Sequence, residues 1–162
     1  MKTYLLFPSD YFDYRKVDEA LMAEYEAAKP HFDIILFNNS KWFDDQRLVL
    51  LGNFPERVKA IYRGWMMKAD DYLVFYQALQ QKNIELVTNP IEYKLFHEFP
   101  NIYPRLEEDT AKTLSFPSGR SPKMSIIRKY FSKFLIKDYV KSVKDSRFPR
   151  FFDSSMSDEE LK

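Results

Sequence analysis

Short apolar runs alternate along this chain with longer stretches in which apolar residues recur every three or four positions. The short runs are typical of buried strands, and the longer stretches are typical of amphipathic helices. The predicted strands are Tyr4–Phe7, Asp33–Phe37, Lys59–Tyr62, Ile84–Val87, Thr113–Phe116 and Phe134–Val140, with Arg47–Leu51 as a further candidate. The predicted helices are Lys16–Ala28, Ala69–Lys82, Pro90–Phe99 and residues 122–131, and residues 101–109 are expected to form an irregular connection.

The first three elements are a strand, a helix and a strand, in the spacing of a βαβ unit. Such a unit places its two strands parallel in one sheet, with the helix on a face of that sheet. The continuous apolar run Asp33–Phe37 fits a strand that is covered on both faces. The sequence therefore predicts an α/β protein with a parallel sheet that contains the strands near Tyr4, Ile35, Ile61 and Leu86.

Composition narrows the chemistry that 162 residues of this kind can perform. The chain has no cysteine and two histidines, His31 and His97, so disulfides, thiolate chemistry and a histidine-rich metal site are not expected. The chain has three glycines, Gly52, Gly64 and Gly119. They are too far apart to form a Rossmann fingerprint or a P-loop. The amino-terminal apolar stretch is too short for a signal peptide, and a cytoplasmic protein is expected.

Charge is distributed unevenly along the chain. The segment from Lys123 to Arg150 holds nine Lys and Arg residues and two Asp residues, a net charge of +7, which leaves −6 for the remainder of a chain of net charge +1. Phenylalanine and tyrosine residues are interspersed among these cations. Two interpretations remain open: the segment binds an anionic ligand, nucleic acid included, or it is a solvated helix face with its loop.

Lys137 follows an apolar triplet and is expected in, or at the end of, a largely buried strand. A buried ammonium group needs a carboxylate or a bound anion as its partner. Along such a strand Leu135, Lys137, Tyr139 and Lys141 share one face. Two ammonium groups beside an aromatic ring are suited to bind a nucleotide: the ammonium groups would contact its phosphates, and the ring would lie against its flat base. The alternative is an edge strand whose lysines prevent aggregation.

Arg63 and Gly64 follow another predicted strand directly. Ligands of open α/β sheets collect beyond the carboxyl ends of the strands. An arginine at that position can hold a carboxylate or a phosphate through two hydrogen bonds, and glycine permits close approach. The alternative for Arg63 is a structural salt bridge. His97 lacks a second ligand in the sequence, and metal binding is not expected there.

Several short motifs occur in a specific order. They are YRGWM at residues 62–66, NP at 89–90, HEFP at 97–100, Thr113–Pro117 and IKDYVKS at 136–142. In this order and spacing, over nearly the whole chain, the sequence resembles the ATP-grasp proteins, and more narrowly an ATP-grasp clade of bacteria and phages. The resemblance implies a pre-ATP-grasp α/β domain over residues 1–110 and an incomplete first ATP-grasp lobe over residues 111–162.

The resemblance also implies an activity, ATP-dependent ligation of a carboxylate to an amine. Lys137 would contact the ATP phosphates, with Lys141 and Tyr139 beside it, and Lys94 is the nearest match to a second, earlier lysine of the family. Arg63 and Gly64 would face the carboxylate substrate.

The magnesium ligands of ATP-grasp proteins belong to a second lobe that follows the position of Lys137 at a distance, and only 25 residues follow Lys137 here. The expectation is therefore a truncated or split ligase, inactive alone, whose Mg²⁺ ligands come from outside this chain. A complementing carboxyl-terminal chain or a homo-oligomer would be its partner. The pattern Ser157-x-x-Glu160 is a capping box, which predicts the start of a helix near the end of the chain. The alternative to the ligase is a nucleic-acid or anion-binding module that uses residues 123–150.

Overall fold

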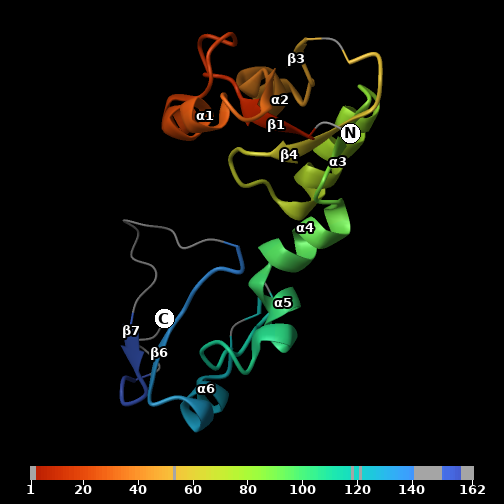
Figure 1. The fold of residues 1–162 in the computed structure, drawn as a ribbon. Coiled ribbons are helices and arrows are strands. Elements are labelled where there is room, and N and C mark those ends of the chain that lie inside the picture. The colour runs from red at the N-terminus through yellow and green to blue at the C-terminus, as the bar shows by residue number, and fades with distance from the viewer. Residues whose placement is uncertain (1–2, 53, 118, 121, 141–150, 158–162) are drawn as a thin grey trace. The chain divides into compact units, whose positions relative to one another are not determined.

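The chain divides into two units along its length, unit 1 from Met1 to Tyr93 and unit 2 from Lys94 to Lys162. The computed structural model describes residues 3–52, 54–117, 119–120, 122–140 and 151–157 (Figure 1). The ATP-grasp domains expected at 1–110 and 111–162 remain predictions. None of the helices in the described ranges is long and apolar enough to cross a membrane.

A five-stranded, mostly parallel sheet organises unit 1. Its strands lie in the order β3-β2-β1-β4-β5. The bounds are β1 Thr3–Pro8, β2 Asp33–Phe37, β3 Leu50–Leu51, β4 Val58–Tyr62 and β5 Ile84–Leu86. The strands β2, β1, β4 and β5 are parallel, and only β3 runs antiparallel, beside β2. The predicted α/β class and the four predicted parallel strands are confirmed.

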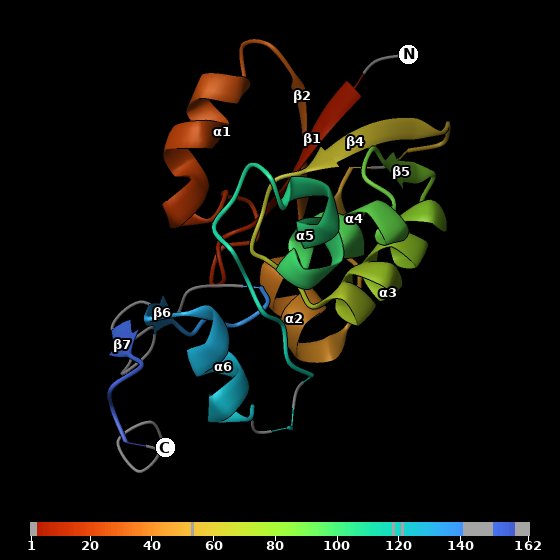
Figure 2. The same cartoon turned by 90° about the horizontal axis from the view of Figure 1, so that it is seen from below.

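Helices cover both faces of this sheet. Alternate residues of β1 therefore belong to two different cores, one on each face. Leu6 belongs to the larger core, which packs under α2 (Asn39–Asp45) and α3 (Ala69–Gln80). Leu5 and Phe7 belong to a smaller core under the 3₁₀ helix η1 (Glu19–Leu21) and α1 (Met22–Ala28). Figures 1 and 2 show α1 on one side of the sheet and α3 on the other.

One helix of unit 1 was not predicted. Asn38, directly after β2, caps α2, and its Oδ1 accepts a hydrogen bond from Lys41 N at 2.9 Å. Trp42 on this helix is buried in the larger core. The helix predicted over Lys16–Ala28 occurs as η1 and α1, from Glu19 to Ala28, and the helix predicted over Ala69–Lys82 occurs as α3, from Ala69 to Gln80.

In its described residues, unit 2 contains three short helices and a strand pair. Its elements are α4 Pro90–His97 (which begins in unit 1), α5 Phe99–Leu106, α6 Met124–Tyr130, β6 Lys133–Leu135 and β7 Phe151–Asp153. Strands β6 and β7 pair antiparallel, and the rings of Phe134 and Phe152 stack at 5.5 Å.

Three expectations for this part of the chain are wrong. Residues 99–106 form helix α5 where an irregular connection was expected, and the predicted strand Thr113–Phe116 is extended chain with no strand partner among the described residues. The strand predicted over Phe134–Val140 ends at Leu135, because its ladder with β7 is only three residues long. Residue 160 of the predicted capping box lies outside the described residues.

Candidate functional site

The carboxyl ends of β1 and β4 form a topological switch point in unit 1. These two strands are neighbours in the sheet. After β1 the chain turns to α1 on one face, and after β4 it turns to α3 on the other face. The two connections leave in opposite directions, and open α/β sheets bind their ligands outside the carboxyl ends of the strands at such a point.

Arg63 lies at this switch point, directly after β4. Its backbone N–H donates to Leu6 O at 2.8 Å and so continues the pairing of β4 with β1. Its guanidinium holds the carboxylate of Glu24, on α1, through two hydrogen bonds: Nη2 donates to Oε2 at 2.9 Å, and Nε donates to Oε1. The hydrogen bond from Arg63 lowers the pKa of Glu24 below its usual range. The sequence analysis left a substrate carboxylate and a structural salt bridge open for Arg63, and in the structure a carboxylate of the chain itself lies there.

Gly64 allows the chain to pass close to an aromatic ring. A Cβ atom at this position would lie 2.7 Å from Oη of Tyr62. That hydroxyl donates to Trp65 O at 2.7 Å and closes the turn after β4. Burial, and then the neighbouring tyrosines, raise the pKa of Tyr62, so it remains a donor. Gly64 thus has a structural role in shaping the turn that carries Arg63, and its predicted contact with substrate stays a prediction.

Two polar residues at the same edge were missed by the sequence analysis. Ser9 directly follows β1 and is fully buried, and its Oγ accepts a hydrogen bond from Asn39 N at 3.2 Å and donates to Asp10 O at 3.0 Å. Asn39, at the start of α2, is 8% exposed, and its buried Oδ1 has no hydrogen-bond partner among the described residues. The sequence did contain a signal for them: both are polar residues that follow closely after an apolar strand. Because parallel strands end at one common edge, such residues are expected to lie close together.

Large aromatic and apolar side chains are exposed around this edge. They are Tyr11, Phe12 and Tyr14 in the loop after β1, and Trp65 and Met66 in the turn after β4. The indole N–H of Trp65 donates to Asp18 Oδ2 at 3.1 Å, and the hydroxyl of Tyr11 donates to Asp44 Oδ2 at 2.9 Å. These bonds fix where the rings of Trp65 and Tyr11 lie. The exposed side chains form an apolar rim around the switch point that can pack against a ligand.

The predicted nucleotide contacts belong to unit 2. Lys137 lies two residues beyond the end of β6 and is exposed, so the expected burial of its ammonium group is wrong. Tyr139 is held in place: its hydroxyl donates to Phe116 O, and its carbonyl accepts from Phe99 N at 3.1 Å. Because the strand ends early, the shared strand face of these residues does not form. Lys141 lies outside the described residues.

The basic segment is only partly available to a ligand. Arg128 donates to Ser154 O at 3.1 Å and to Met156 O at 2.8 Å, and so fixes the chain after β7 against α6. In contrast, Lys123 and Lys129 are exposed. The segment therefore combines a structural arginine with solvated lysines, and its residues 141–150 lie outside the described ranges.

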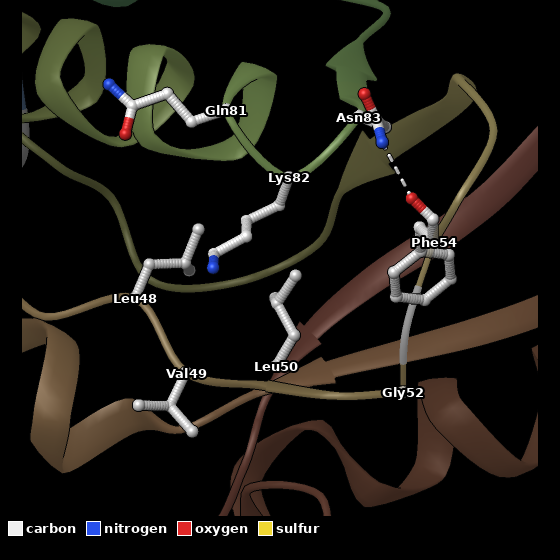
Figure 3. Close-up of a pocket in the computed structure, with 8 residues that line it drawn as sticks. All are labelled: Leu48, Val49, Leu50, Gly52, Phe54, Gln81, Lys82 and Asn83. Atoms are coloured by element: carbon white, nitrogen blue, oxygen red, sulfur yellow. Dashed lines mark hydrogen bonds between the residues drawn. The ribbon is translucent and has the colours of Figure 1, made fainter.

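A cavity of about 470 Å³ lies elsewhere in unit 1, between the segment around β3 and the carboxyl end of α3. Figure 3 shows its lining, which combines apolar side chains of residues 48–54 with residues 81–83. It shares no residue with the switch point described above. Over the described ranges, no group of three or more His, Asp or Glu residues could hold a metal ion.

Comparison with protein-family models, curated proteins and solved structures gives no match for this chain. The function is therefore argued from the chain itself.

Proposed function

We propose that this chain is part of an ATP-grasp-type, ATP-dependent carboxylate–amine ligase, and that the switch point of unit 1 receives its carboxylate substrate. The observation that carries the proposal is the Arg63–Glu24 pair. Arg63 already holds a carboxylate through two hydrogen bonds, at the place where α/β sheets bind ligands. The order of the motifs along the chain gives the reaction class, by resemblance.

A ligand carboxylate would compete with Glu24 for the guanidinium of Arg63. The side chains of both residues are partly exposed, 49% for Arg63 and 39% for Glu24, so the exchange does not require the core to open. A surface pair of this kind contributes at most about 1 kcal/mol, which a substrate with additional contacts can exceed. Trp65 and Tyr11 would supply such contacts from the rim.

ATP would supply the phosphoryl group that turns the carboxylate into an acyl phosphate, which an amine then attacks with release of phosphate. In unit 2, Lys137 is exposed and makes no ion pair with a described residue. Tyr139 is 38% exposed. A cation and a partly exposed ring suit a phosphate chain and a flat base. Among the described residues, no group of three or more His, Asp or Glu residues could hold the magnesium ion that such a reaction uses.

The test of the carboxylate site uses the whole chain and two variants with opposite expected effects. The probes are the twenty amino acids together with malonate, succinate and glutarate, and the readout is the indole N–H signal of Trp65 in ¹H–¹⁵N spectra. For the probe that binds, Arg63→Gln should weaken binding about tenfold, whereas Glu24→Gln removes the internal competitor and should strengthen it. Equal affinity in all three proteins, or no shift of that signal with any probe, would contradict the proposal.

A second candidate function is binding of single-stranded nucleic acid by the basic segment. The observation that favours it is Phe151, which is 85% exposed beside Leu135 on the β6–β7 pair, with Lys133 two residues from Leu135 on the same face. Exposed aromatic rings among cations serve as stacking platforms for bases. Binding of a mixed-sequence oligonucleotide that weakens steeply with salt and survives Lys137→Ala would favour this function over the ligase.

A further inference from the structure

The cavity beside β3 is lined by apolar side chains that pack against the larger core and are only partly buried by it. Leu48 and Leu50 extend to the same side of the chain, as residues two apart in an extended segment do, and the ring of Phe54 closes one end (Figure 3). The volume of about 470 Å³ falls within the range of about 300–1,000 Å³ that is typical of small-molecule sites. Apolar walls of this extent suit a ligand with a compact aliphatic or aromatic body.

One cation reaches into this cavity. The side chain of Lys82 leaves the carboxyl end of α3 and lies across the cavity, with its ammonium group toward Leu48 (Figure 3). It makes no ion pair with any residue in the described part of the chain. The nearby carboxylate of Glu85, on β5, lies 3.9 Å from Arg57 and is already paired. Lys82 is exposed, so water solvates its ammonium group in the free chain. A cation beside apolar walls is complementary to a ligand that joins an anion to an apolar body.

The remaining polar groups of the lining are already engaged or turned away. Asn83 has a left-handed backbone with φ of 62°, and its Nδ2 donates to Phe54 O at 2.9 Å and to Pro55 O at 3.3 Å. These bonds hold the wall in place. The side chain of Gln81 extends away from Lys82 in Figure 3. Lys82 is thus the group that would recognise the polar end of a ligand.

We propose that this cavity binds a small carboxylate with a compact apolar body, such as an arylacetate. The carboxylate would pair with the ammonium group of Lys82, and the apolar body would cover Leu48, Leu50 and Phe54. This site is separate from the switch point that Arg63 occupies, and it does not depend on the ligase function proposed above.

The experiment compares three probes of similar shape and different charge on the full chain. Phenylacetate, phenylacetamide and 2-phenylethylamine are titrated while ¹H–¹⁵N spectra are recorded. Phenylacetate should bind about tenfold more tightly than phenylacetamide, and 2-phenylethylamine should bind most weakly. The shifts should map to residues 48–52 and 81–83. Equal affinity for acid and amide, or no shift of these residues, would overturn the proposal.

Variants separate this site from other cations of unit 1. Lys82→Gln should reduce phenylacetate binding to the level of phenylacetamide and leave phenylacetamide unchanged. Lys68→Gln, at the opposite end of the same helix, should change neither affinity, because Lys68 does not line the cavity. Arg63→Gln should also leave phenylacetate binding intact. If Arg63→Gln abolishes it instead, the probe has bound at the switch point, and the cavity is not its site.

Discussion

Replacing Gly64 by alanine should destabilise unit 1 through a single steric contact. The new Cβ would lie 2.7, 2.8 and 2.9 Å from Oη, Cζ and Cε2 of Tyr62, which is closer than side-chain carbon atoms approach one another. The ring cannot move away freely, because it packs against the rings of Phe75 and Tyr72 at centroid distances of 5.4 and 6.2 Å. Its hydroxyl is also bound to the carbonyl of Trp65. Either the turn or the ring must shift.

The expected loss can be estimated from these contacts. Overpacking of a well-filled site costs about 1–3 kcal/mol, and loss of the Tyr62 hydrogen bond adds about 1 kcal/mol. We expect Gly64→Ala to lower the free energy of unfolding of unit 1 by about 2–3 kcal/mol. Urea denaturation followed by tryptophan fluorescence measures it, because both tryptophans of the chain, Trp42 and Trp65, belong to unit 1.

A double-mutant cycle identifies the contact responsible. Leucine at position 62 lacks the ring atoms that the new Cβ would meet, so Gly64→Ala in a Tyr62→Leu background should cost less than about 0.5 kcal/mol. A loss below that size in the wild-type background, or the same loss of about 2 kcal/mol in both backgrounds, would refute the steric reasoning.

Three further predictions follow from contacts described above. Phe75→Ala should lower the free energy of unfolding by about 3–5 kcal/mol, because Phe75 is fully buried, whereas Leu73→Ala on the exposed side of the same helix should cost less than about 1 kcal/mol in the same urea experiment. Glu24→Gln should remove a contribution of at most about 1 kcal/mol at pH 7. Since the folded pKa of Glu24 is lowered from 4.5, this contribution is present above that value and disappears as the pH falls through the folded pKa, so wild type and variant should converge in acid denaturation series. Arg128→Ala leaves two backbone carbonyls without their donor and should increase amide exchange around β7, whereas Lys129→Ala should not, which hydrogen-exchange mass spectrometry can resolve.

The parallel sheet of unit 1 was predictable because its signals are local. Continuous apolar runs such as Asp33–Phe37 mark strands buried on both faces, and the spacing between them fixes the βαβ connection. The position of Arg63 at the carboxyl end of a strand followed from the same pattern. Its partner Glu24 could not be predicted, because the two residues are 39 positions apart. Nothing in the sequence pattern of α1 indicates which of its glutamates would pair with Arg63.

The failures concern elements whose signals are short or depend on distant partners. Helix α2 has seven residues, too few for helical periodicity, and its capping residues also fit a turn. Helix α5 contains Pro100 in its first turn and Pro104 in its interior, and an interior proline usually indicates that a segment is not helical. The early end of β6 depends on β7, a three-residue strand that lies about 16 positions further along the chain. Pairing over that distance leaves no local signal.

The most direct test of the proposed ligase is a titration of the full chain with ATP and magnesium, followed by ¹H–¹⁵N spectra. We expect shifts at Lys137 and Tyr139 in unit 2. Lys137→Ala should abolish them, and Lys123→Ala, at an exposed lysine of the same basic segment, should leave them in place. ATP binding that survives Lys137→Ala, or shifts spread evenly over the basic segment and lost in both variants, would contradict it.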